Sequence, residues 1–153
     1  MSSSVRLLFS TTQLPFSLLI RAVTWSQWSH VALVDIDAGT VIEAAAGHGV
    51  REVRLEDAIA RASSYQLVDL PSRNPVAIIT AARSQIGKPY DWSAIAGIGM
   101  HRDWQEEDAW FCSELVAWAA AAAGEEWFRC SALRRVLPQH LWMLPPQQGL
   151  CSI

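Results

Sequence analysis

The sequence predicts an α+β fold in which a small antiparallel sheet packs against helices. Short runs rich in Val, Leu and Ile are separated by turn signals, as is typical of antiparallel strands. Other segments carry helix signals, namely a capping side chain, a proline in the first turn or a terminal glycine. The 153 residues are about the length of one domain, and no repeat or low-complexity linker divides them. We therefore expect a single domain over residues 1–153.

The first third of the chain predicts a strand, a helix and a hairpin. Residues 7–9 form a short apolar strand, and a helix-like apolar period over residues 16–24 follows a proline suited to a first turn. Residues 29–36 are rich in Val and Leu and predict a second strand. The turn signal at 37–39 leads into a returning strand over 40–45, which the next two glycines end.

The remaining elements are mainly helices. Residues 55–62 predict a short helix and residues 65–70 a strand. The segment 74–86 combines an Asn cap, a proline at the first position and a following glycine, which agree on a helix. Residues 111–123 form the strongest helix, alanine-rich and closed by glycine. A short helix is expected at 131–136.

Composition and charge exclude several classes. Apolar residues make up 51% and charged residues 18%, which is ordinary for a globular protein. The net charge of −3, without long runs of either sign, gives no argument for binding nucleic acid or an anionic membrane. The start of the chain lacks the pattern of a secretory signal, and the most apolar stretch is half of a transmembrane length. We expect a soluble, cytoplasmic protein.

Three cysteines, Cys112, Cys130 and Cys151, are an odd number at spacings that match no zinc pattern. A disulfide framework is not expected, although a single bridge between Cys130 and Cys151 stays open. One special thiol in a reduced compartment fits the count better. Neither a metal nor an organic cofactor is predicted.

Cys112 lies at the start of the alanine-rich helix, where unpaired backbone amides carry partial positive charge. A thiol placed there ionises more readily, and the same amides can hold the oxyanion formed when a carbonyl is attacked. The alternative is a small buried apolar cysteine.

His30 begins an apolar strand and can take a proton from a thiol near neutral pH. A histidine at such a position can equally be structural. The two residues together are the minimum for nucleophilic catalysis by cysteine.

Glu43 lies on the returning strand, on the same face as His30 if the hairpin loop has an even number of residues. A turn centred on Ala38-Gly39 would pair Glu43 with Val34, roughly 13 Å along the strand from His30. A turn one residue earlier would place Glu43 within diagonal reach, at about 7–8 Å. Glu43 then either orients the imidazole or is an edge carboxylate.

Four segments, taken in order, resemble a known family. They are Trp-Ser-His-Val-Ala-Leu-Val at 28–34, Val-Ile-Glu-Ala at 41–44, Gly-Lys-Pro-Tyr-Asp at 87–91 and Phe-Cys-Ser-Glu-Leu-Val at 111–116. The chain resembles the permuted branch of the NlpC-type papain-like superfamily over about residues 6–140. That branch includes YiiX-like bacterial proteins and, more distantly, lecithin retinol acyltransferase. Histidine before cysteine is the mark of the permutation, and the resemblance implies a circularly permuted papain-like fold and a bacterial or phage origin.

The resemblance also implies roles for individual residues. Cys112 matches the nucleophile, His30 the general base and Glu43 the polar residue that holds the imidazole. Tyr90 matches a tyrosine beside the nucleophile that helps to bind substrate or oxyanion, or else it is only a turn residue. Phe111 and Ser113, which flank the nucleophile, are expected to contribute to substrate or oxyanion binding.

One position departs from the superfamily pattern. Unpermuted cell-wall peptidases of the NlpC type usually carry Asp before the cysteine, to bind the free amine of a peptide stem, whereas this chain has Phe111. An apolar residue cannot neutralise an ammonium group. Phe111, together with Trp92, Trp104 and Trp110, predicts a more apolar groove, unless these aromatics merely cover the helix start.

We therefore expect a cysteine hydrolase that acts through a thioester. His30 removes the thiol proton, Cys112 attacks a carbonyl, nearby amides hold the oxyanion and His30 protonates the leaving group. The expected substrate contains an amide, for example in a cell-wall peptide. A lipid-directed thioesterase or acyltransferase, and a non-catalytic binding module on the same fold, are the alternatives.

Overall fold

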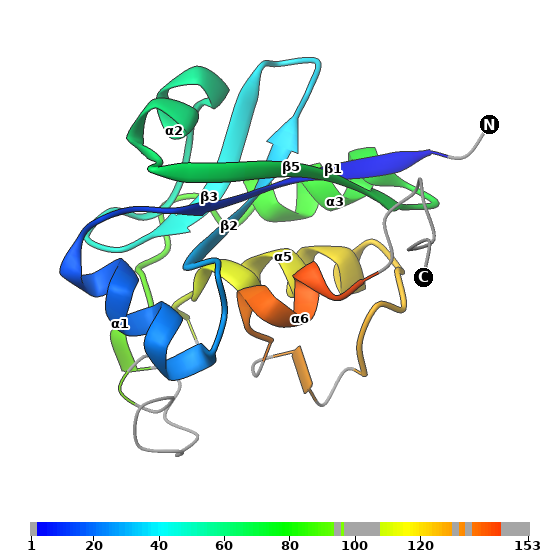
Figure 1. Cartoon of the computed structure of the whole chain (residues 1–153). Coiled ribbons are helices and arrows are strands. Elements are labelled where there is room, and N and C mark those ends of the chain that lie inside the picture. Colours follow the sequence, from blue (N-terminus) through cyan, green and yellow to red (C-terminus); the bar gives the residue numbers. More distant parts are fainter. Residues whose placement is uncertain (1–2, 94–95, 97–107, 130–131, 134–135, 145–153) are drawn as a thin grey trace, which may run out of the picture.

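The computed structural model describes residues 3–93, 96, 108–129, 132–133 and 136–144 (Figure 1). Five strands form one antiparallel sheet in the order β4-β3-β2-β1-β5. The strands are β1 (Ser4–Thr11), β2 (His30–Asp35), β3 (Thr40–Ala45), β4 (Gly49–Arg54) and β5 (Ser64–Pro71). The helices are α1 (Pro15–Thr24), α2 (Leu55–Arg61), α3 (Pro75–Arg83), α5 (Cys112–Ala122) and α6 (Pro138–Trp142). The predicted α+β class, with an antiparallel sheet against helices, is confirmed.

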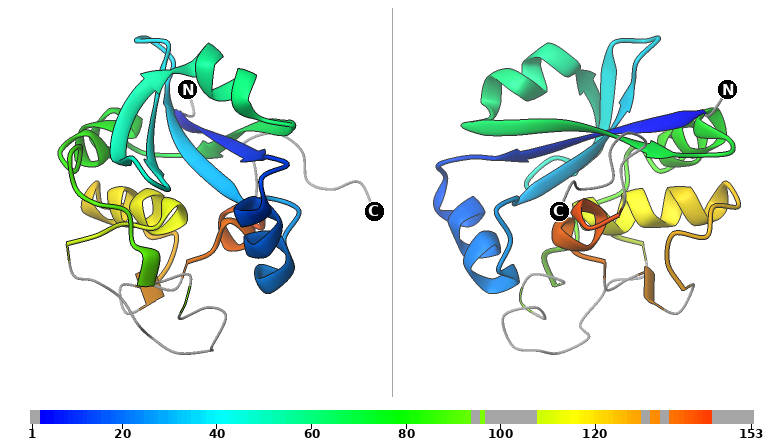
Figure 2. Two further views of the ribbon diagram at one scale, coloured as in Figure 1. Left: turned by 90° about the vertical axis from the view of Figure 1, so that its left-hand side faces the viewer. Right: turned by 45° about the vertical axis from the view of Figure 1, so that its right-hand side comes forward.

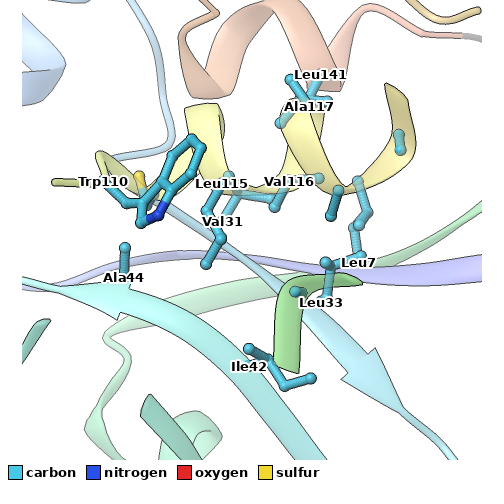
Figure 3. Close-up of a cluster of buried hydrophobic side chains, with 14 of the residues drawn as sticks. Leu7, Val31, Leu33, Ile42, Ala44, Trp110, Leu115, Val116, Ala117 and Leu141 are labelled. Atoms are coloured by element: carbon cyan, nitrogen blue, oxygen red, sulfur yellow. The ribbon is translucent and has the colours of Figure 1, made fainter. Parts of the chain in front are cut away.

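Helices cover both faces of the sheet, and this explains why the strands are apolar without strict alternation. α3, α5 and α6 lie on one face, where side chains such as Leu7, Leu33 and Leu115 interlock (Figure 3). α2 lies on the opposite face, over a smaller cluster that includes Leu8 and Val34 (Figure 2). A strand that is buried on both sides has no solvent face to mark with polar residues.

The hairpin of β2 and β3 fixes the position of Glu43. Leu33 pairs with Ile42 and Val34 with Val41, around a turn over residues 36–39. Continued by one pair, this register places Glu43 opposite Ala32 and diagonal to His30. The earlier of the two turns considered from the sequence is therefore the one that forms.

Strand β4 was not predicted from the sequence. It pairs with β3 along its whole length at the edge of the sheet, and its outer residues are charged and partly exposed. Two other bounds also differ, because β1 is longer than the predicted strand at 7–9 and α3 ends at Arg83. Residues 84–87 form a turn rather than the predicted last helical turn.

A glycine lets the segment after α3 approach β4 closely. Gly49 has φ +71°, and a Cβ atom there would lie 2.5 Å from the carbonyl oxygen of Lys88. Backbone hydrogen bonds join Val50 N to Lys88 O (2.8 Å) and Gly87 N to Val50 O (2.9 Å). The chain then forms a parallel bridge between Tyr90 and Trp110, immediately before α5. The β3–β4 turn thereby holds Tyr90 beside the start of α5.

Several predictions fall on residues outside the described part of the chain. These are the environment of Trp104, the pairing of Cys130 and Cys151, and most of the helix expected at 131–136. Among the residues that are described, no helix combines the length and apolar character that a membrane crossing needs.

Candidate active site

His30 and Glu43 are joined by a short hydrogen bond. The imidazole Nε2 of His30, the first residue of β2, lies 2.7 Å from Oε2 of Glu43 on β3. Both side chains come from neighbouring strands at the diagonal spacing that the register sets. The sheet therefore fixes the imidazole from one side, through a carboxylate that is only 3% exposed.

Two arginines hold the other oxygen of this carboxylate. Arg51, directly opposite Glu43 on β4, donates from Nε to Oε1 (3.0 Å), and Arg61 at the end of α2 donates from Nη2 to the same atom (3.0 Å). Burial of Glu43 would raise the pKa of its carboxyl, but the bonds to His30 and Arg61 outweigh burial and hold that pKa well below its ordinary value. Glu43 is thus a fixed anion.

Cys112 approaches the imidazole from α5. It is the first residue of that helix, after Phe111 as N-cap, and its side chain lies close enough to His30 to act on the pKa of the imidazole. Burial opposes a charge on the imidazole, but the bonds to Cys112 and Glu43 prevail and raise the pKa of His30 to about 10. The structure therefore brings together all three residues of the predicted catalytic set.

Tyr90 lies next to this group and is almost buried. Its ring contacts Phe111 and Trp92, with centroids 6.1 and 5.2 Å away. Burial raises the pKa of the Tyr90 phenol, and the nearby negative charge of Cys112 raises it further. The phenol is therefore a neutral hydrogen-bond donor near neutral pH, at the place where the sequence predicts a substrate-binding tyrosine.

Phe111 and Ser113 flank Cys112, but their side chains point into the core. Phe111 belongs to the main hydrophobic cluster, and the Ser113 hydroxyl donates to the carbonyl of Val136. What these positions offer a substrate is backbone, since the first amides of a helix have no intrahelical acceptor. The amides of Cys112 and Ser113 are the candidate oxyanion donors.

A pocket of about 310 Å³ opens beside the imidazole, with wall residues from α1 and α2. His30, Glu43 and Tyr90 form part of its wall, and Leu14, Phe16 and Ile20 of the α1 region form an apolar part. Cys112 is 1% exposed and does not line it. An acyl group entering this pocket therefore reaches the sulfur past His30 and Tyr90.

The predicted aromatic groove forms only in part. Trp110 is buried in the core, where its indole N–H donates to the side chain of Gln85 (3.2 Å). Trp92 is 53% exposed, and its ring makes tilted and edge-on contacts with Phe16 and Tyr90, which line the pocket. The apolar surface beside the site thus comes from Phe16 and Trp92 rather than from Trp110.

Sequence reasoning missed Arg51 and Arg61. Arg51 lies on the strand that was not predicted, and Arg61 ends a helix that nothing in the sequence connects to the site. The available signal was indirect: a carboxylate on a buried strand needs a cationic partner, and both arginines follow it within 18 residues.

Comparisons with known proteins agree with this geometry. A family model described as permuted papain-like amidase enzyme, YaeF/YiiX, C92 family, matches residues 6–142. Among solved structures, the crystal structure of the metalloprotein YiiX from Escherichia coli O157:H7 superposes with a TM-score of 0.68 at 19% identity. The match covers 94% of this chain and 93% of that one. A search of curated proteins found no match. The predicted circularly permuted papain-like fold is confirmed.

YiiX from Escherichia coli is described as a metalloprotein. In this chain, the described residues contain no group of three or more His, Cys, Asp or Glu side chains placed to hold a metal ion. The residues around His30 are instead arranged as a chain of hydrogen bonds from Arg51 and Arg61 through Glu43 to the imidazole and the thiol.

Proposed function

The chain belongs to the permuted papain-like amidase family and is a cysteine hydrolase of the peptidase and amidase type, and we propose that Cys112, His30 and Glu43 are its catalytic residues. One observation carries this assignment. The imidazole of His30 is hydrogen-bonded to the Glu43 carboxylate, and the Cys112 side chain at the start of α5 lies close enough to raise the pKa of the imidazole. This is the arrangement of nucleophile, base and orienting group that activates a thiol.

The proposed reaction begins from a thiolate–imidazolium pair. Because the pKa of His30 lies near 10, the imidazole carries a proton near neutral pH and can act as the acid of the reaction. The thiolate attacks the amide carbonyl carbon, a C–S bond forms and the oxygen takes the negative charge. The C–N bond then breaks, His30 gives its proton to the departing nitrogen, and a thioester remains.

Water completes the proposed cycle. His30, now neutral, takes a proton from water as the oxygen attacks the thioester carbon. The C–S bond breaks and returns the thiolate, while the acyl group leaves as a carboxylic acid that gives its proton to the solvent. The amides of Cys112 and Ser113 and the phenol of Tyr90 are placed to stabilise the oxyanion in both steps.

The proposed substrate contains an amide bond, as in cell-wall peptides. The test is intact-protein mass spectrometry after rapid mixing with peptide amides and cell-wall fragments, with Cys112→Ala as control. We expect the mass of Cys112-containing protein to rise by the mass of the acyl group and the control to stay unmodified. An adduct in both proteins, or turnover by Cys112→Ala, would exclude Cys112 as nucleophile.

A lipid-directed thioesterase is a second candidate, favoured by one specific observation. Leu14, which lines the pocket, and Leu18, Leu19 and Trp25 along α1 are exposed. An acyl chain could extend from the pocket over this surface. Acyl thioesters of increasing chain length, assayed beside peptide amides, distinguish the two, because a lipid-directed enzyme gains kcat/KM with every added methylene that finds apolar surface.

A further inference from the structure

The pocket beside His30 has an excess of positive charge. Arg51 and Arg61 line its wall, together with Glu43, which is the single carboxylate among the described lining residues. Glu43 balances the charge of one of these arginines. One arginine charge is left over. The molecule as a whole carries −3, so this cationic pocket runs against the charge of the chain.

Both guanidinium groups keep donors that Glu43 does not use. Arg51 reaches Glu43 through Nε and Nη2, and Arg61 uses Nη2 for Glu43 and Nε for the carbonyl of Asp57 (3.3 Å). Within the described part of the chain, the Nη1 group of each makes no hydrogen bond to protein. The two side chains are 25% and 47% exposed, so a molecule in the pocket can reach them.

The opposite wall strengthens the effect of this charge. Phe16 and Ile20 give the pocket an apolar side, and charges interact more strongly where the surrounding dielectric constant is low. An arginine fork also matches the geometry of a carboxylate. An ammonium group, by contrast, would meet two guanidinium groups and an imidazolium.

We propose that this pocket selects amide substrates that carry a carboxylate near the scissile bond, and that Arg51 and Arg61 bind that carboxylate. The inference rests on the proposed function, because it places the scissile amide at Cys112. Both arginines and the imidazole bond to the same Glu43 side chain, so a carboxylate held by the arginines lies close to the reacting carbonyl. The unpermuted cell-wall peptidases of the NlpC type bind a substrate amine through an Asp, whereas this pocket binds a substrate carboxylate through its arginines.

The experiment compares substrates that differ only in charge. N-acetyl-alanine 4-nitroanilide is neutral, N-succinyl-alanine 4-nitroanilide adds a carboxylate on the acyl side, and N-acetyl-alanine 5-amido-2-nitrobenzoate adds one on the leaving group. We expect kcat/KM for one of the two anionic substrates to exceed that of the neutral one by about fivefold, the upper end of the range for a single exposed ion pair. The anionic substrate with the higher kcat/KM shows on which side of the scissile bond the arginines act. Raising the salt concentration should reduce the preference.

Variants then tie the preference to the arginines. Arg61→Gln should bring the ratio of anionic to neutral kcat/KM towards one, whereas Arg61→Lys should keep part of it. Because Arg61 also binds Glu43, its loss lowers kcat/KM for the anionic and the neutral substrate alike. The measured quantity is therefore the ratio of the two kcat/KM values. Arg54→Gln is the matched control, since Arg54 is exposed, pairs with Glu56 and does not line the pocket.

A binding measurement covers variants that are too slow to assay. In Cys112→Ala protein, titration calorimetry with the same three compounds should show tighter binding of the preferred anion, and Arg61→Gln should abolish the difference. Equal kcat/KM and equal affinity for all three compounds would overturn the inference and leave the proposed hydrolase intact. Turnover of none of them, with no acyl adduct on Cys112 from any amide, would instead overturn the proposed function.

Discussion

The charge of the His30 imidazole is the property on which the proposed chemistry depends. Its ring nitrogens are shared between Glu43 and Cys112, and these bonds raise its pKa from 6.5 to about 10. The proton therefore stays on the imidazole until the pH rises through the folded-state value. Below that pH the imidazolium can protonate the leaving group, and above it the leaving group loses its proton donor.

The Glu43→Gln variant tests this electrostatic account. A neutral amide loses the charge that stabilises the imidazolium, so the pKa of His30 falls from about 10 towards its ordinary value of 6.5. We expect the alkaline limb of the pH profile of kcat to move to lower pH, and kcat at pH 7 to fall by between about 10²- and 10⁴-fold without vanishing. A full pH–rate profile is the measurement. An unshifted limb with wild-type rates would show that Glu43 is only structural.

A second prediction for a single residue concerns Tyr90. Its buried phenol stays protonated and faces the pocket beside Cys112, where it can donate to the oxyanion. We expect Tyr90→Phe to lower kcat by on the order of 10²-fold, which is typical of removing one oxyanion donor, with little change in KM. The check is steady-state kinetics on a nitroanilide substrate, alongside thermal unfolding. If kcat is unchanged, Tyr90 serves packing alone.

At the scale of elements, the β3–β4 turn links the sheet to the nucleophile helix. Gly49 allows Lys88 to approach within backbone hydrogen-bonding distance of Val50, and the following residues pair with Trp110 just before α5. The position of Tyr90 against Cys112 therefore depends on a glycine that lies far from both in the sequence.

Gly49→Ala should disturb this link, and Gly47→Ala provides a matched control. Both glycines have positive φ, but only at Gly49 would a Cβ atom meet the Lys88 carbonyl oxygen. The backbone conformation alone costs about 1–3 kcal/mol of unfolding free energy in either variant. We expect Gly49→Ala to cost more than Gly47→Ala in urea unfolding, and to lower kcat as well. Equal stability and equal kcat in the two variants would contradict the role given to the close approach.

The elements also show where sequence reasoning succeeded and where it stopped. Residues 29–36 and 40–45 combine apolar runs with a turn signal, and both strands form close to the predicted bounds. β4 was missed because an edge strand with exposed charges carries no apolar period. The sequence could not decide between two hairpin registers whose turns differ by one residue, because the local turn residues allow both. Packing on both faces of the sheet determines which register forms.

At the scale of the whole molecule, the site is assembled from parts that are distant in the chain. His30 and Glu43 come from the middle of the sheet, Arg61 from the helix above it and Cys112 from the helix below (Figure 2). Composition and spacing could propose His30, Glu43 and Cys112, but not Arg61, and they could not show that residues 30 and 112 meet. The order of the four motif segments supplied that expectation, through resemblance to a family in which histidine precedes cysteine.

The central claim is that the fold turns Cys112 into a nucleophile by placing it against His30. The most direct test is the rate at which iodoacetamide alkylates Cys112 at pH 7, followed by peptide mass spectrometry to separate it from the other cysteines. We predict rapid alkylation of wild-type Cys112 and a rate at least about tenfold lower in His30→Gln, because the thiolate loses its imidazolium partner. Equal rates in the two proteins, or no alkylation of Cys112 in either while the protein is folded, would contradict the account.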